Sequence, residues 1–196
     1  MSILNSIFLK VSSVKKISLL FFASHLVLLL MMTYTFPVIN HQIGTKAFDL
    51  QPFGYSVSVA ETIVNNLDDR TIRLYLFPQL LLLDLLYPFL LALFLGSLLF
   101  RLIKTTASAG KLASILLILP SIAMICDYSE NICVILMITK SIEVSETIVY
   151  LSSTATVSKG VSTSIAWIAI LILSVKWIIM KIRAWYCEQA LTAKMQ

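Results

Sequence analysis

The chain has 196 residues, of which 59% are hydrophobic and 13% are charged, and its mean hydropathy is +0.92. Because soluble domains carry about 25% charged residues, a soluble fold would have too little polar surface to cover itself. The formal net charge of +5 comes from lysines and arginines near the ends of apolar segments, so nucleic acid is not an expected partner. The three cysteines include no Cys-x-x-Cys pair and predict no disulfide framework.

Four apolar runs are long enough to cross a bilayer, which takes about 20 residues for ~30 Å of hydrocarbon. They cover residues 17–38, 77–103, 112–138 and 161–182. The first is longer than the apolar part of a secretory signal and lacks a small-x-small cleavage site, so we expect it to be retained. The chain shows no internal repeat. The sequence therefore predicts an all-α, polytopic membrane protein, with residues 1–196 forming a single four-helix transmembrane domain.

Basic residues concentrate in three of the segments outside these runs. They are Lys10, Lys15 and Lys16 in the N-terminal tail, Arg101, Lys104 and Lys111 in the second connection, and Lys181, Arg183 and Lys194 at the C-terminal end. In the first and third connections, which include Lys140 and Lys159, acidic residues accompany the basic ones. Because cytoplasmic loops carry the excess of Lys and Arg, we expect both termini to be cytoplasmic and the first and third connections to face outward.

The first connection, residues 40–76, is the only long one. Its residues 48–55 (FDLQPFGY) are rich in turn formers and aromatics. Ser58 and Glu61 then have the spacing of a capping box, and apolar residues recur with helical period at Ala60, Ile63, Val64 and Leu67. This pattern predicts a short amphipathic helix on the outer surface of the bundle. The segment either only shields the helix ends or serves as a lid over a cavity.

Three prolines lie in the two middle spans. Pro78 and Pro88 are in the second, where a kink is expected near residues 83–87, and Pro120 is in the third. Proline removes a backbone donor and clashes with the preceding turn. We therefore expect both helices to be irregular near their polar residues, which opens space between them.

Three acidic residues inside the apolar runs are the most informative feature of the sequence. Asp84 lies in the second span, and Asp127 and Glu130 lie in the third. A carboxylate near the bilayer centre costs at least ~2.5 kcal/mol on insertion scales, so such groups are expected to face the bundle interior. At ~1.5 Å per residue, Asp84 and Glu130 lie about 10 Å and about 12 Å from the outer ends of their helices. Their depths therefore match.

Helical spacing extends this set to a polar pocket in the outer half of the bundle. Tyr87 follows Asp84 by three residues, and Asn131 follows Asp127 by four, so each pair shares a helix face. The predicted ligand-binding residues are Asp84, Tyr87, Asp127, Glu130 and Asn131. The sequence does not decide which basic residue balances the charge of these acids. His25 and Lys176 lie nearer the cytoplasmic side, and Arg70 and Arg73 lie at the outer mouth.

Several functions fit such a pocket. The acids can form an internal hydrogen-bond network, bind a cationic, amphiphilic or lipid-like ligand, or relay protons or a cation in a small transporter. A di-iron bundle needs two carboxylate-x-x-His motifs, which are absent, so no metal and no cofactor are predicted. Of these functions, binding of a small amphiphilic or lipid-like molecule is favoured. The chain can instead be a non-catalytic accessory subunit, with a membrane protein partner or a second copy covering its polar residues.

Two motifs, Phe48-Asp49-Leu50-x-Pro52-Phe53-Gly54-Tyr55 and Asp127-x-x-Glu130-Asn131, resemble those of an uncharacterised family of four-span membrane proteins. That resemblance covers most of the chain and implies no activity. A weaker similarity is to the emopamil-binding and sigma-2 receptor (EXPERA) family, which implies a four-span bundle whose embedded acids bind amines or help to isomerise sterols. It rests on Ala23-Ser24-His25 and on Asp84 with Pro88. Asp127 and Glu130 lie in a different span from that family's acids.

Overall fold

The computed structural model describes residues 8, 11–108 and 110–193, and these residues form helices and connections without a β-strand. The predicted all-α class is therefore confirmed. Lys10 and Lys194, which entered the orientation argument, lie outside the described residues. Four helical segments are long and apolar enough to cross a membrane: Val14–Ile43, Asp69–Thr105, Lys111–Ile138 and Glu146–Gln189.

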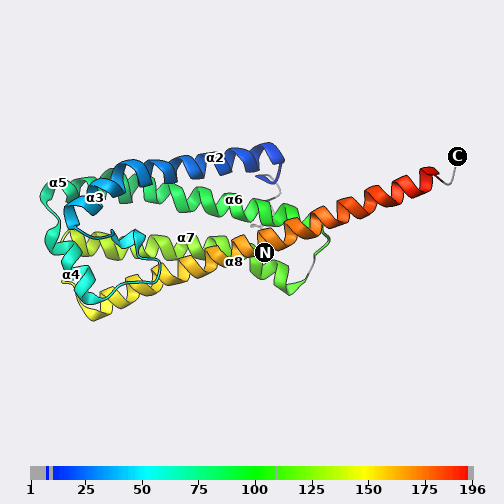
Figure 1. Cartoon of the computed structure of the whole chain (residues 1–196). Helices are drawn as coiled ribbons and strands as arrows, with labels where there is room; N and C mark the ends of the chain where they lie inside the picture. Colours follow the sequence, from blue (N-terminus) through cyan, green and yellow to red (C-terminus); the bar gives the residue numbers. More distant parts are fainter. Residues whose placement is uncertain (1–7, 9–10, 109, 194–196) are drawn as a thin grey trace.

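The four long segments lie side by side (Figure 1). The first consists of α2 (Val14–Leu30), the π-helical stretch η1 (Met31–Thr35) and α3 (Phe36–Ile43). The second consists of α5 (Asp69–Leu74), the π-helical stretch η3 (Tyr75–Leu83) and α6 (Asp84–Thr105), and the other two are α7 (Lys111–Ile138) and α8 (Glu146–Ala193). α6 contacts α2, α7 and α8, and α7 packs most extensively against α8.

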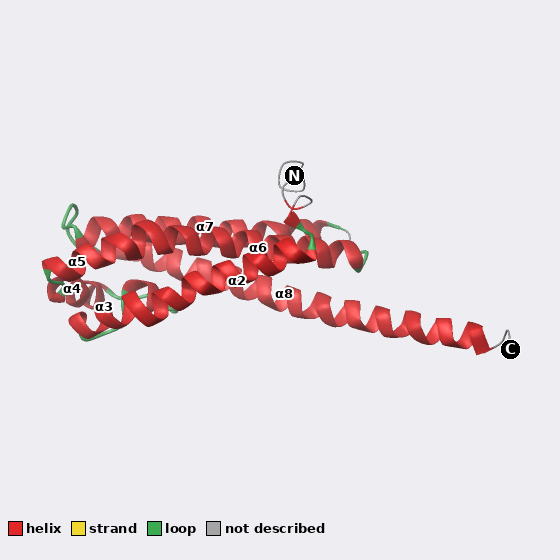
Figure 2. Ribbon diagram, turned by 90° about the horizontal axis from the view of Figure 1, so that it is seen from above, coloured by secondary structure: helices red, strands yellow, loops and turns green. Residues whose placement is uncertain are grey.

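The two ends of the bundle differ. α3, α5 and the short helices η2 (Phe48–Leu50) and α4 (Val57–Asn66) gather at one end, which we call the loop end. At the opposite end, which we call the far end, α8 continues well beyond its neighbours (Figure 2). The loop end is the end predicted to face outward.

The helix bounds differ most from the predicted spans in α8, which begins at Glu146 rather than near residue 161. Residues 146–160 are rich in Ser and Thr, so a prediction based on apolar residues alone assigns them to a connection. In the structure Ser152 and Thr156 are buried and bonded to side chains of other segments. Polar residues can continue a membrane helix when neighbouring segments satisfy them. The predicted third span agrees with α7 to within one residue.

The second span is interrupted as predicted, but closer to its start. Phe77 has a non-helical backbone (φ −140°, ψ 124°) within η3, directly before Pro78, whereas the kink was expected near residues 83–87. The expected irregularity at Pro120 is wrong, because α7 is one continuous α-helix. A long helix can lose one hydrogen bond when its neighbours hold it in place.

The irregular stretches of the first two spans meet each other. η1 packs against η3, and the Thr35 hydroxyl donates a hydrogen bond to the Gln79 side-chain oxygen. Both side chains are fully buried. π-Helical stretches leave backbone groups without regular partners and often occur at functional sites. This junction brings Asp84, the first residue of α6, to the interior of the bundle.

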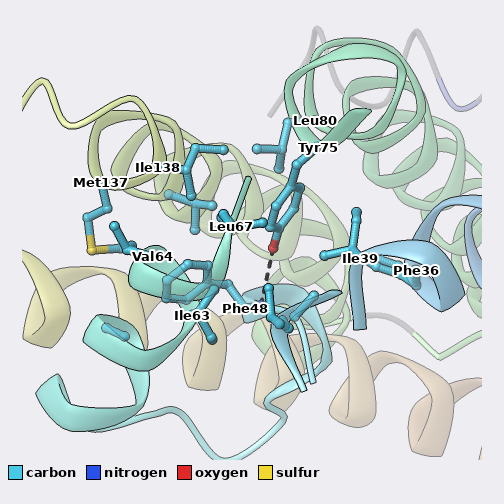
Figure 3. Close-up of a cluster of buried hydrophobic side chains, with 14 of the residues drawn as sticks. Phe36, Ile39, Phe48, Ile63, Val64, Leu67, Tyr75, Leu80, Met137 and Ile138 are labelled. Carbon is cyan, nitrogen blue, oxygen red and sulfur yellow. Dashed lines mark hydrogen bonds between the residues drawn. The ribbon is translucent and has the colours of Figure 1, made fainter. Parts of the chain in front are cut away.

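The predicted amphipathic helix is present as α4, with Ala60, Ile63 and Val64 buried. Its N-cap is Ser56, whose hydroxyl accepts a hydrogen bond from the Val59 amide, and not Ser58 as the capping-box spacing suggested. Its apolar face does not merely lie on the surface. Figure 3 shows it packed into a core formed with Phe36, Ile39, Phe48, Tyr75, Leu80, Met137 and Ile138.

Candidate functional site

A buried ion-pair cluster joins α7 to α8. The Lys159 Nζ atom lies 2.8 Å from Asp127 Oδ1 and 2.6 Å from Glu130 Oε2. The contact with Asp127 is also a hydrogen bond. The contact with Glu130 is an ion pair only, because its geometry does not meet the angles of a hydrogen bond. Glu130 is completely buried, and its Oε1 accepts a hydrogen bond of 2.7 Å from the Thr156 hydroxyl. One ammonium thus links two carboxyl groups inside the bundle.

Helical spacing accounts for this geometry. Asp127 and Glu130 are three residues apart on α7, and Thr156 and Lys159 are three apart on α8, so each pair shares one face of its helix. α7 and α8 run antiparallel from their short connection at residues 139–145. The two faces therefore meet over one helical turn.

Two further carboxyl groups approach the cluster from other segments. Asp84 comes from α6 and interacts electrostatically with Asp127, Lys159 and Asp49. Asp49 comes from η2 in the first connection. The Tyr75 hydroxyl donates a hydrogen bond of 2.8 Å to Asp49 Oδ2 and accepts one of 3.1 Å from the Phe48 amide; Figure 3 shows Tyr75 directed at Phe48. The first connection thus supplies a site residue.

Tyr75→Phe should destabilise the protein by about 1–3 kcal/mol, because it leaves a carboxyl oxygen of Asp49 and the buried Phe48 amide without their partner. We expect a lower melting temperature of the purified protein. Tyr150→Phe is the matched control, since Tyr150 is 71% exposed. Equal melting temperatures for both variants would mean that the Tyr75 hydroxyl does not hold this segment.

The same connection is also fixed to α8. The Tyr55 amide donates to the Ser153 hydroxyl at 3.0 Å, and the Tyr55 hydroxyl donates to the Ser152 hydroxyl. Burial raises the pKa of the Tyr55 phenol well above its ordinary value, so this group keeps its proton and remains a donor. Residues 48–55 are therefore held between Tyr75 on one side and α8 on the other.

A cavity of about 350 Å³ adjoins these groups. Its polar lining is Asp49, Asp84, Tyr87, Asp127, Lys159, Thr163 and Ser164, and its apolar lining includes Met31, Leu91, Leu95, Ala123 and Met124. All four long segments and the first connection contribute to its walls. Concave, mostly apolar sites with a few convergent polar groups are typical of small-molecule binding.

The carboxyl groups at this cavity are not fully satisfied. Asp49 Oδ1, Asp84 Oδ2 and Asp127 Oδ2 are buried and accept no hydrogen bond from a donor among the described residues, and the carboxyl groups of Asp84 and Asp49 lie next to each other. Buried polar atoms without partners are uncommon in native proteins and call for an explanation. Four carboxyl groups face one ammonium here, so the cluster can accept further protons, hydrogen bonds or positive charge.

The structure brings all five predicted site residues to this region, in different roles. Asp84, Tyr87 and Asp127 line the cavity. Glu130 does not line it and instead holds Lys159 and Thr156. The Asn131 side chain donates to the Asp84 backbone carbonyl at 3.4 Å, which supports the start of α6.

The counter-charge is Lys159, which none of the sequence candidates anticipated. Lys176 donates instead to the Ser108 hydroxyl, and the His25 ring bonds to the backbone carbonyl of Phe21 on its own helix. Arg70 and Arg73 are exposed. The sequence prediction places Lys159 in the third connection, because the residues before it are polar and do not show that α8 begins at Glu146.

Comparisons of the chain with protein-family models, with curated proteins and with solved structures find no match. Within the described ranges no group of three or more His, Cys, Asp or Glu side chains has the arrangement of a metal site.

Proposed function

We propose that this chain is a multi-pass membrane protein, with both termini cytoplasmic, that binds a small amphiphilic or lipid-like ligand in the cavity between its helices. Four sufficiently long apolar helices and the excess of Lys and Arg in the N-terminal tail, the second connection and the C-terminal end support the topology. The loop end then faces outward, and the first connection covers the cavity from that side.

The observation that carries the proposal is the pairing of apolar walls with buried carboxyl oxygens that have no protein partner. Asp49 and Asp84 can only accept hydrogen bonds when ionised. The ligand proposed here has a donor as its polar group, such as an amine or a hydroxyl, and binds the ionised form of these groups. Its apolar part lies against Met31, Leu91 and Leu95, which line the cavity.

Lys159 has a supporting role in this arrangement. Its charge is already opposed by Asp127 and Glu130 at 2.8 Å and 2.6 Å, so little of it is available to an anionic ligand. Among the residues that the structure describes, no basic side chain lies as close to Asp84 or Asp49. The cavity therefore favours a neutral or cationic polar group over an anionic one.

Asp84→Asn is expected to weaken ligand binding by about 10–100-fold, the factor that corresponds to one charge-assisted hydrogen bond of about 1.5–3 kcal/mol. Native mass spectrometry of protein gently extracted from its own membrane measures the effect as loss of a co-purifying small molecule. Glu61→Gln, on the exposed face of α4, is the control and should keep that molecule.

The same experiment separates the competing functions. A stoichiometric protein partner without any small molecule would identify an accessory subunit, and the buried acids would then meet that partner. If neither is retained and the Asp84→Asn protein is otherwise normal, the cluster is an internal network that only stabilises the fold. Either result would contradict ligand binding.

A further inference from the structure

A second cavity, of about 420 Å³, lies at the far end of the bundle, between α7, α8 and the last turn of α6. Its walls are apolar and include Leu112, Leu116, Ile165 and Ile172. Two of these residues, Leu112 and Ile172, are 69% and 63% exposed, so the cavity is a groove open to the surroundings of the helices rather than an enclosed space. It shares no lining residue with the acidic cavity.

One end of the groove is polar and basic. Lys176 and Ser108 line it there, and the Lys176 ammonium donates to the Ser108 hydroxyl at 2.7 Å. An ammonium has three donors, so this bond fixes its position and leaves two donors for another acceptor. Lys104 and Lys111 are exposed and flank the lining residues Ile103 and Leu112 in sequence.

No acidic residue accompanies these lysines at the groove. Every Asp and Glu of the chain lies at the loop end or in the acidic cluster, except Glu188 near the C-terminus of α8. The charge of the far end is thus one-sided. Basic pockets between membrane helices on the cytoplasmic side are suited to anionic lipid head groups, which are enriched in that leaflet.

The length of the groove fits one lipid chain. It reaches along α8 from Lys176 to Ile165, and eleven residues of α-helix span about 16 Å. That is about half of the ~30 Å hydrocarbon thickness of a bilayer, the depth of one leaflet. A head group placed at Lys176 would therefore put an acyl chain along Leu116 and Ile165 within the same leaflet.

We propose that this groove is a binding site for an anionic phospholipid, with the phosphate group at Lys176 and Ser108 and one acyl chain between α7 and α8. The site rests on the proposed membrane topology but not on the ligand of the acidic cavity. It also gives the exposed Lys176 ammonium an anionic partner in addition to the Ser108 hydroxyl.

The test uses the full-length protein in detergent and native mass spectrometry with added lipid. Phosphatidylglycerol and phosphatidylcholine with identical acyl chains are compared, and the first should bind more tightly. Lys176→Ala should weaken phosphatidylglycerol binding about fivefold, the factor expected for one lysine at an anionic surface. Lys176→Arg keeps the charge and should retain binding.

Two more variants distinguish a site from general attraction. Lys46→Ala removes the same charge from the exposed loop end and should leave the affinity unchanged. Ala113→Phe fills the groove and should lower binding of either lipid there without changing net charge. Equal loss in Lys176→Ala and Lys46→Ala would overturn the proposal, as would equal affinity for the two lipids. Unchanged phosphatidylglycerol binding in Lys176→Ala would overturn it even if Ala113→Phe failed to fold.

Discussion

Replacing Lys159 with methionine is expected to lower the free energy of unfolding by about 3–5 kcal/mol. The substitution preserves most of the side-chain volume but leaves Asp127 and Glu130 without the ammonium that lies 2.8 Å and 2.6 Å from them. Removing one partner of a buried ion pair is strongly destabilising because the remaining charge is uncompensated. At about 2–4 °C per kcal/mol for a chain of this size, the melting temperature should fall by roughly 6–20 °C, as followed by thermal unfolding in detergent.

A rescue variant makes this prediction specific. Adding Asp127→Asn and Glu130→Gln to Lys159→Met removes the uncompensated carboxyl groups, and the triple variant should recover most of the lost stability. Replacing every member of a buried ion pair with uncharged hydrophobic residues is often neutral or stabilising, and the amides introduced here likewise leave no charge uncompensated. Lys181→Met, at an exposed lysine of the same helix, is the control. A Lys159→Met protein that melts like the Lys181→Met protein would show that the cluster does not stabilise the fold.

The bundle itself could be predicted from sequence because one physical rule dominates it. A run of about 20 apolar residues is long enough for a helix that crosses a membrane, and α7 agrees with the predicted span to within one residue. The acids within these spans were equally visible, since their burial cost makes them rare. Depth counting then placed Asp84 and Glu130 at matching levels, and the structure brings both to the same region.

Lys159 was missed because the start of α8 is polar. Apolarity alone starts the fourth span near residue 161, whereas the helix begins at Glu146. A signal was nevertheless present: Val149, Ser152, Thr156 and Lys159 follow each other at intervals of three and four residues. The first three are buried on one face. This helical period, with hydroxyl side chains at Ser152 and Thr156, places Lys159 on the same helix face as these residues.

Asp49 could not be found in this way. Residues 48–55 of the first connection have no period, and their aromatic side chains differ in exposure: Phe48 is completely buried and Phe53 is 94% exposed. Which residue points inward depends on where Tyr75 lies, and that position depends on the π-helical stretch η3. Such a contact between distant segments leaves no local pattern in the sequence.

Gly54→Ala is expected to displace residues 48–55 from the bundle. Gly54 has a φ of +80°, and a Cβ atom there would lie 2.1 Å from the Ser153 hydroxyl oxygen and 3.4 Å from Val157 Cγ2. The left-handed conformation costs an alanine about 1–2 kcal/mol, and the steric overlap adds about 1–3 kcal/mol. The chain can avoid both costs by releasing the Tyr55 amide from Ser153, a bond of 3.0 Å. Faster hydrogen exchange of the amides of residues 48–55 would report this release.

Gly44→Ala is the matched control for this prediction. Gly44 also has a positive φ, +71°, but no atom lies within 4 Å of the position of its Cβ, so the variant bears only the conformational cost. Ser153→Ala removes the acceptor of the Tyr55 amide without any steric overlap, so on its own it should also speed exchange of that amide. If Gly54→Ala and Gly44→Ala exchange at the same rates, close packing against Ser153 does not hold the connection.

The Gly54→Ala variant also separates the two interpretations of the first connection. Since residues 48–55 carry Asp49 to the cavity, their displacement removes one carboxyl group from the ligand site while Asp84 and Asp127 stay on their helices. A lid predicts that ligand loss follows the increase in exchange in Gly54→Ala, and that Gly44→Ala keeps the ligand. A surface cover predicts faster exchange with the ligand retained, because the remaining carboxyl groups and the apolar walls would then suffice.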